Sequence, residues 1–199
     1  LRSMGRRTKK NPEVTLGRRQ RRRKEQRRKN VREVISTILY LAILCAAVYF
    51  ILHYVGQRTV VRGDSMDTTL SDGQNLIMDK LSYHFRNPER YDIVIFPGPE
   101  EYGEHPYYIK RVIGLPGETV QIKKGKVYIN GELLDEPYLS EEPTGDFGPY
   151  QVPEDSYFML GDNRAVSKDS RYWHNTYVKK DKIIAKAFVM YWPSLKWLG

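Results

Sequence analysis

One stretch of this chain constrains its fold more than any other. Residues 34–55 are 22 consecutive residues without a charged side chain, and most of them are apolar. As a helix, such a stretch covers roughly 33 Å, close to the hydrocarbon thickness of a bilayer at about 30 Å. His53 and the tyrosines Tyr49 and Tyr54 lie near one end, where water and headgroups can solvate them. We therefore expect residues 34–55 to form a transmembrane helix.

A cleaved secretory signal peptide is the alternative interpretation of this stretch. The apolar core of a signal peptide is shorter, typically about 7–15 residues, and it ends at a site of small residues. The flank from His53 to Arg58 contains no Ala-x-Ala pattern. A retained anchor is therefore favoured.

The charges on either side of the apolar stretch indicate its direction. Residues 1–33 hold 15 of the 33 Lys and Arg residues but only three acidic residues. The far flank carries only Arg58 and Arg62. By the positive-inside rule, residues 1–33 are predicted to be a basic cytoplasmic tail and residues 56–199 an extracytoplasmic domain. Before Asn30 the tail lacks an apolar face, so we expect it to be mobile.

The basic run from Arg18 to Lys24 could also bind nucleic acid, but beside a membrane span contact with anionic lipid is favoured. Without residues 1–33 the chain has 18 basic and 21 acidic residues, a net charge of −3, which argues against a nucleic-acid partner for the folded part. The single cysteine, Cys45, lies within the apolar stretch, so no intrachain disulfide is expected.

Beyond residue 56, short β-type segments alternate with turn signals. Lys123-Lys124-Gly125 and Asn130-Gly131 are predicted hairpin turns, and we expect no further long helix. The pattern predicts a mainly β domain of antiparallel, barrel-like or Greek-key sheets, with residues 118–155 as a candidate inserted β sub-domain. Strands are predicted at residues 75–80, 91–96, 107–113, 119–122, 126–129, 157–160 and 184–192.

Lys110 interrupts one of these apolar strands. Alternation places Lys110 on one face and Arg111 on the other, an unusual pattern for a half-buried strand. Most strand lysines extend into solvent, and that is one interpretation of Lys110. The other is a buried lysine whose pKa is lowered by desolvation, so that its amine can act as a base.

Ser65 is the candidate nucleophile for such a base. A serine hydroxyl is weak alone and needs an adjacent group to accept its proton. Gly63 permits unusual backbone angles beside it, and the N–H of Ser65 could stabilise an oxyanion. A serine and a buried lysine can form a hydrolase without histidine or metal, and His84, His105 and His174 show no metal-ligand spacing. No cofactor is expected. A bland alternative for residues 63–66 is a capped turn that opens a short helix.

A third polar block, residues 161–171, is dense in acids, arginines and hydroxyls. Its members suit a hydrogen-bonded support beneath an active site, but a loop held by surface ion pairs, each of little energy, is equally compatible with the sequence. The candidate supporting residues are Asp162, Arg164, Ser167, Asp169 and Arg171.

In this order, and after an N-terminal span, these blocks resemble type I signal peptidases, the leader peptidases of the single-span Gram-positive-like type. The resemblance extends over roughly residues 34–192, and its lysine and Gly-Asp-Asn-Arg blocks are specific in combination. The matching segments are residues 63–70, 91–96, 108–117 and 161–171.

The resemblance implies a mainly antiparallel β fold whose core is shared with LexA-type repressors. It implies that Ser65 attacks the scissile carbonyl, that Lys110 is the general base and that Ser167 orients the lysine. Gly63 stands where some bacterial members carry an oxyanion-stabilising serine. The family's structural positions are matched in this chain by Asp162, Arg164, Asp169 and Arg171. The positions that line the family's shallow substrate pockets, for small residues at −1 and −3, are matched by Val61, Met66, Leu70, Tyr108 and Ile109.

The implied partners are the signal peptides of exported preproteins, the lipid bilayer and the protein-export translocon. Thr68 stands where the family usually has proline, which removes no reacting group but encourages the alternative of a specialised peptidase for pilus or surface proteins. A non-catalytic, membrane-tethered assembly factor is a further alternative, opposed by the presence of both Ser65 and Lys110. A DNA-binding LexA-type repressor is opposed by the uncharged span and by the lack of a helix-turn-helix pattern.

Overall fold

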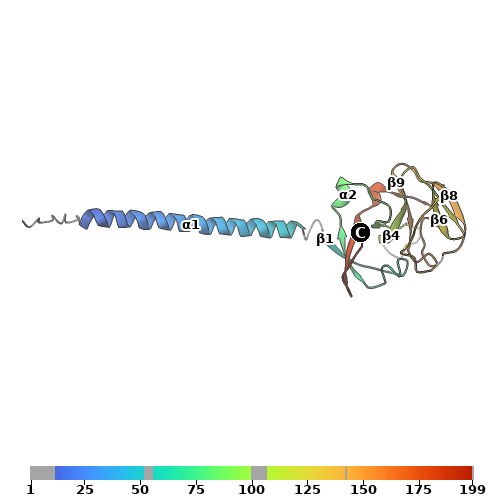
Figure 1. Ribbon diagram of the computed structural model, residues 1–199, viewed down its shortest axis with the longest axis horizontal. Coiled ribbons are helices and arrows are strands. Elements are labelled where there is room, and N and C mark those ends of the chain that lie inside the picture. Colours follow the sequence, from blue (N-terminus) through green and yellow to red (C-terminus); the bar gives the residue numbers. More distant parts are fainter. Residues whose placement is uncertain (1–11, 52–55, 100–106, 142, 199) are drawn as a thin grey trace, which may run out of the picture. The chain divides into compact units, whose positions relative to one another are not determined.

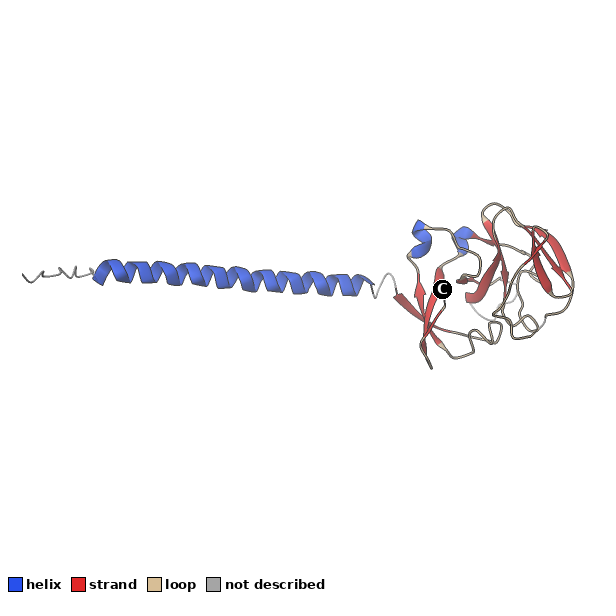
Figure 2. Ribbon diagram, in the orientation of Figure 1, coloured by secondary structure: helices blue, strands red, loops and turns tan. Residues whose placement is uncertain are grey.

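The computed structural model of the protein describes residues 12–51, 56–99, 107–141 and 143–198. The chain divides into two units, residues 1–50 with one long helix and residues 51–199 with the strands. Figure 2 shows this division by secondary structure.

Helix α1 runs without interruption from Pro12 to Phe50 (Figure 1). Proline suits the first position of a helix because its missing N–H would have had no partner there. The part from Arg23 to Phe50 is long and apolar enough to cross a membrane by length and composition. Its apolar side chains are exposed on every side, for example Leu39 at 60%, Tyr40 at 75% and Leu41 at 54%. A helix that is apolar all round requires an apolar surrounding.

The start of this helix differs from the sequence prediction. The tail that we expected to be mobile before Asn30 is helical from Pro12 onward. Arg, Lys, Gln and Glu are good helix formers, and extending an existing helix needs no new nucleus. Residues 1–11 of the tail and residues 52–55 of the predicted span lie outside the described residues.

The larger sheet has eight strands, and every pairing in it is antiparallel. A short helix, α2 (Ser82–Phe85), follows its second strand, and a 3-10 turn, η3 (Lys180–Lys182), follows β10. The spatial order is β1 (Gly56–Val60), β2 (Asn75–Asp79), β11 (Ala185–Trp192), β3 (Ile93–Pro97), β4 (Tyr107–Gly114), β9 (Ser156–Leu160) and β10 (Val178–Lys179), with β12 (Lys196–Trp197) paired to β11.

Strand β3 shows why the apolar run at its centre is continuous rather than alternating. Ile93 and Ile95 pack into one hydrophobic cluster, whereas Val94 and Phe96 pack into another. A strand buried on both faces needs apolar residues at every position. β3 therefore lies between two cores, and its neighbour β4 is brought into the same buried environment.

The smaller sheet has the order β7 (Glu132–Leu133), β6 (Lys126–Ile129), β5 (Thr119–Lys123) and β8 (Phe147–Gln151). Both predicted hairpin turns are present, because Lys124, Gly125, Asn130 and Gly131 all have positive φ angles. Two consecutive positive φ angles are the signature of the type I′ turn that matches strand twist. This sheet lies within the predicted sub-domain at residues 118–155, in the same unit as the larger sheet.

The predicted fold class, a mainly antiparallel β structure with one N-terminal apolar helix, is confirmed. All seven predicted strands are found in the described residues, with small shifts of their ends. Four further strands, β1, β8, β10 and β12, were not predicted, and the short β7 follows the predicted Asn130-Gly131 turn. β1 and β8 are half-exposed strands of mixed polarity, which lack a clear apolar pattern. β10 and β12 have only two residues each, so they are defined by their pairing with β9 and β11.

Candidate active site

Ser65 lies on the turn that follows β1. Before it, Gly63 adopts a φ of 82° and donates its N–H to the carboxylate of Asp72 at 2.8 Å. After it, the N–H of Leu70 donates to the carbonyl of Met66 at 2.8 Å, and both side chains are buried in the core. The turn is fixed on both sides, and the half-buried Ser65 lies between these two anchors.

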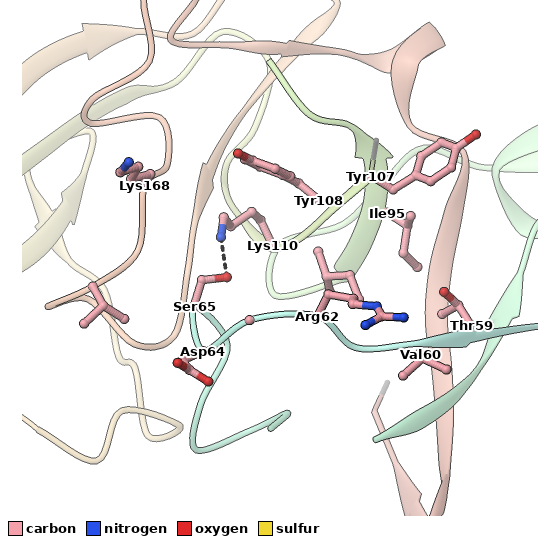
Figure 3. Close-up of a pocket in the computed structure, with 13 residues that line it drawn as sticks. Thr59, Val60, Arg62, Asp64, Ser65, Ile95, Tyr107, Tyr108, Lys110 and Lys168 are labelled. Carbon is pink, nitrogen blue, oxygen red and sulfur yellow. Dashed lines mark hydrogen bonds between the residues drawn. The ribbon is translucent and has the colours of Figure 1, made fainter. Parts of the chain in front are cut away.

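Lys110 extends from β4 to Ser65. Its Nζ lies 2.5 Å from Ser65 Oγ, as Figure 3 shows. The Lys110 residue is only 3% exposed, and no carboxylate of the described residues forms an ion pair with it. Burial lowers the pKa of Lys110 from 10.5 to about 8, although the Asp169 carboxylate opposes this change. A lysine with such a pKa can accept a proton from a hydroxyl near neutral pH.

Arg111 occupies the other face of β4 and is also buried. Its Nε donates to Asp162 Oδ1 at 2.8 Å, its Nη2 donates to Asp162 Oδ2, and its Nη1 donates to the carbonyl of Tyr91 at 2.9 Å. The unusual pattern of one charge on each face therefore has two different causes. Arg111 is neutralised by a bidentate ion pair, whereas Lys110 contacts a hydroxyl.

The loop that begins at Gly161 packs directly against the nucleophile. A Cβ added to Gly161 would lie 2.2 Å from Ser167 Oγ and 2.4 Å from the carbonyl oxygen of Ser65. The N–H of Asn163 donates to that same carbonyl at 3.1 Å. Only a glycine leaves room for this approach, so the loop and the Ser65 turn are held together through backbone.

A buried ion pair closes the loop on itself. Arg171 donates to both oxygens of Asp169, at 2.8 and 2.9 Å, and also to the carbonyls of Arg164 and Ser167 at 2.9 and 3.3 Å. Asp169 is fully buried and also accepts the N–H of Gly161 at 3.1 Å. The alternative of a loop held by surface ion pairs is wrong, because these charges are inside the protein.

Ser167 does not make the contact that the resemblance implies. Its Oγ is buried beside Gly161 and has no hydrogen-bond partner among the described residues. Lys110 therefore receives no direct hydrogen bond from it there, and an orienting role of Ser167 stays a prediction. A buried hydroxyl without a partner is uncommon and costs stability.

A cleft of about 550 Å³ lies over the Ser65–Lys110 pair (Figure 3). Of the five predicted substrate-binding residues, Tyr108 and Ile109 line it. The structure does not bring the other three to the cleft: Val61, Met66 and Leu70 are 2%, 1% and 0% exposed within the core, because their apolar side chains turn inward after β1. The lining further includes Thr59, Val60, Arg62, Gly63, Asp64, Ile95, Tyr107, Val166 and Lys168.

The half of β4 beside the cleft has one unused edge among the described strands. β3 pairs with β4 from Tyr107 to Arg111, whereas β9 pairs with β4 only from Arg111 onward. The backbone of residues 107–110 can therefore accept an additional extended strand next to Ser65.

Glu136 is the supporting residue that the sequence did not reveal. It forms a buried ion pair with Arg164, whose Nε also donates to the carbonyl of Gly161 at 3.1 Å. Glu136 belongs to the segment after β7 and had no local signal, since its partner lies 28 residues away. Among the described residues, no His, Cys, Asp and Glu side chains are grouped so that they could hold a metal ion.

Comparison with known proteins decides the family. Residues 32–192 match the family model described as signal peptidase, peptidase S26. The chain belongs to this family. The predicted resemblance to type I signal peptidases is confirmed, and so is the assignment of the chain as a protease.

Several relatives carry the same family name. The chain is 42% identical over 143 residues to the probable signal peptidase I-2 of Synechocystis sp., a match that covers 70% of this chain and 65% of that relative. It is 44% identical over 151 residues to the signal peptidase I of Bacillus licheniformis, covering 71% and 76%. A solved signal peptidase I from Enterococcus faecalis V583 is 39% identical, with a TM-score of 0.44, and the match covers 51% of this chain and 97% of the other.

Proposed function

We propose that the chain is a membrane-anchored serine endopeptidase that removes N-terminal signal peptides from exported preproteins. Membership of the signal peptidase family supports this reaction class. The observation that carries the mechanism is the 2.5 Å distance between Ser65 Oγ and Nζ of the buried Lys110.

In the proposed mechanism the neutral Lys110 amine accepts the proton of Ser65 while Oγ bonds to the scissile carbonyl carbon. The N–H of Ser65 donates to the developing oxyanion. As the C–N bond breaks, the Lys110 ammonium returns the proton to the leaving amine. Water then attacks the acyl-enzyme, with Lys110 accepting its proton, and the cleaved signal peptide leaves as a carboxylate while Ser65 recovers its hydroxyl proton.

The substrate is proposed to bind as an extended strand along residues 107–110. Backbone hydrogen bonds to a strand edge give affinity without sequence preference, and the side-chain pockets then give specificity. The side chains of Tyr108, Ile109 and Ile95 in the cleft wall support apolar pockets for the small residues at −1 and −3. Bulky residues at those positions would be excluded by volume.

The apolar helix α1 and the family relatives fit a membrane-anchored enzyme. We further propose that the basic residues before the span are cytoplasmic and that residues 56–199 are extracytoplasmic, in a single-pass topology. Preproteins that bear signal peptides are then the partners on the outer side. Contact with the export translocon follows from the same location, and no nucleic-acid partner is proposed.

Cleavage of a preprotein with an Ala-x-Ala site by the detergent-solubilised chain tests this function. The parent is expected to cut after the second small residue, and Ser65→Ala and Lys110→Met are expected to be inactive. If Lys110→Met cut as fast as the parent, the proposed mechanism would be wrong. A folded parent that left several such preproteins intact, but cut a pilus or surface protein, would replace the general function with the specialised one.

A further inference from the structure

The segment after β7 contacts the active-site support from outside the catalytic strands. It begins with Leu134, whose N–H donates to the carbonyl of Val127 in the smaller sheet at 2.9 Å. The carbonyl of Asp135 accepts the hydroxyl of Tyr91 at 2.8 Å. Residues 134–139 are therefore fixed to the smaller sheet and also to Tyr91, which lies just before β3.

Glu136 of this segment binds Arg164, one of the arginines buried beneath the active site. Its carboxylate accepts both terminal nitrogens of Arg164, and the two side chains are 7% and 4% exposed. The remaining nitrogen of the guanidinium, Nε, donates to the carbonyl of Gly161 at 3.1 Å. Gly161 in turn lies close to the Ser65 turn, because a Cβ added to it would be 2.4 Å from the carbonyl oxygen of Ser65. Only one residue therefore separates this ion pair from the nucleophile turn.

Tyr138 of the same segment contacts Arg111, another of these buried arginines. Its ring centroid lies 4.0 Å from the guanidinium carbon of Arg111, and its hydroxyl donates to Glu136 at 2.6 Å. Arg111 is the ion-pair partner of Asp162 and follows Lys110 directly on β4. The two residues of the segment thus hold Arg164 and Arg111 at the same time, and they are bonded to each other.

We propose that Glu136 and Tyr138 form a clamp that positions Ser65 against Lys110. Glu136 acts through Arg164 and Gly161 on the Ser65 turn, and Tyr138 acts through Arg111 on β4. Neither residue touches substrate, so both are positioning residues. The inference rests on the proposed peptidase function. The smaller sheet then has the role of holding the segment that carries Glu136 and Tyr138.

The clamp is expected to be sensitive to loss of the Glu136 carboxylate because that carboxylate neutralises a buried charge. Removing the carboxylate of Glu136 leaves the Arg164 guanidinium buried without an ionic partner, and buried charges without partners rearrange their surroundings. A displacement of about 1 Å at reacting atoms can lower the rate on the order of 100-fold. Substrate binding along residues 107–110 does not involve Glu136, so the loss should fall on kcat.

The test uses the full chain in detergent micelles and a preprotein with an Ala-x-Ala site, well below the melting temperature of every variant. Glu136→Gln is expected to lower kcat roughly 10- to 100-fold while KM changes less than about twofold. Tyr138→Phe removes one hydroxyl and keeps the ring over Arg111, so it is the milder variant, with an expected loss of about three- to tenfold in kcat.

Glu118→Gln is the matched control. Glu118 forms a bidentate ion pair with Arg90, at 2.5 and 3.0 Å, and accepts the N–H of Leu115 at 2.8 Å. Glu118 stabilises the loop at residues 115–118, and its side-chain hydrogen bonds within the described part of the chain go to Arg90 and Leu115 rather than to residues 161–171. Its kcat is expected to stay at the parent value even where its melting temperature falls.

A double-mutant cycle separates positioning from general stability. If Glu136 acts through Arg164, then Glu136→Gln should cost little additional kcat in an Arg164→Leu background. Parent-like kcat for Glu136→Gln, an equal loss of kcat in Glu118→Gln, or additive losses in the cycle would each overturn the clamp. An inactive parent would contradict the proposed function and the clamp together, whereas an active parent with an active Glu136→Gln would overturn the clamp alone.

Discussion

The two faces of β4 hold consecutive buried cations in opposite ways. On one face, Arg111 is 6% exposed and forms a bidentate ion pair with Asp162. On the other, Lys110 is 3% exposed and contacts the hydroxyl of Ser65. The burial is alike and the partners differ, and the difference teaches where the chemistry lies. A charge with a full counter-charge supports the structure, whereas a buried amine without one is poised to lose its proton.

The largest expected effect comes from removing Lys110, the buried cation that forms no ion pair within the described part of the chain. Lys110→Met should lower kcat/KM by about 10²- to 10⁴-fold, the usual contribution of a general base. The same change should raise the free energy of unfolding at pH 7 by on the order of 1–3 kcal/mol, because a buried charged amine is replaced by an apolar side chain. Steady-state cleavage and chemical denaturation measure both. A variant that is inactive and also less stable would contradict the difference between the two faces.

The stability gain of Lys110→Met should depend on pH. The pKa of Lys110 is about 8 in the folded protein and 10.5 ordinarily. Between these values the unfolded chain binds more protons than the folded one, so the stability of the parent rises with pH. The gap between variant and parent is therefore full below pH 8 and closes as pH approaches 10.5. Denaturation series at several pH values provide the check, and a gap independent of pH would count against a buried amine.

Removing the paired cation should have the opposite effect on stability. Arg111→Met leaves Asp162 buried without its counter-charge, and breaking such a pair costs about 3–5 kcal/mol. Thermal or chemical unfolding measures the loss. If Arg111→Met were as stable as the parent, the ion pair would not be a structural element, and the contrast with Lys110 would fail.

A smaller effect tests the contact between the loop that begins at Gly161 and the turn that carries Ser65. Gly161→Ala places a Cβ against Ser65 and Ser167, and overpacking of this kind costs typically about 1–3 kcal/mol. Because one of the displaced groups, the carbonyl of Ser65, belongs to the nucleophile turn, kcat should fall as well. Gly56→Ala is the control, since its Cβ would meet nothing nearer than 3.4 Å. Similar kinetics for the two variants would show that the close approach at Gly161 has no catalytic consequence.

The smallest expected effect belongs to an ion pair at the surface. Arg86 and Glu89 lie 3.4 Å apart with side chains 37% and 70% exposed. Such pairs contribute about 0–1 kcal/mol, so Arg86→Ala should change the free energy of unfolding by less than about 0.5 kcal/mol. A loss as large as that of Arg111→Met would mean that burial is not what distinguishes the supporting charges.

The features predicted correctly from the sequence are those with local causes. The apolar run at Ile93–Phe96 predicts a strand buried on both faces, and Asn130-Gly131 predicts a type I′ turn. Lys110 could be singled out because a lysine interrupts an apolar strand. The pairing with Ser65 was not readable from spacing, since 45 residues separate them, and came from the family resemblance.

The features that were missed depend on contacts between distant segments. Glu136 has no sequence signal because its role depends on an ion pair with Arg164, which lies 28 residues away in the chain. Val61, Met66 and Leu70 lie in the core, and their role in substrate pockets stays a prediction, since the path of the turn around Ser65 could not be predicted from their apolar character. The N-terminal helix extends to Pro12 because helix propagation continues through good helix formers without needing an apolar face.

The pH dependence of kcat/KM for Ala-x-Ala cleavage tests the central claim most directly, since it reports the ionisation of the free enzyme. With Lys110 neutral in the reactive form, activity should rise with pH and reach half of its maximum near pH 8, the pKa that burial gives this lysine. A half-maximal pH near 10.5, the ordinary value, or a rate that does not change with pH, would contradict a buried, unpaired Lys110 as the base.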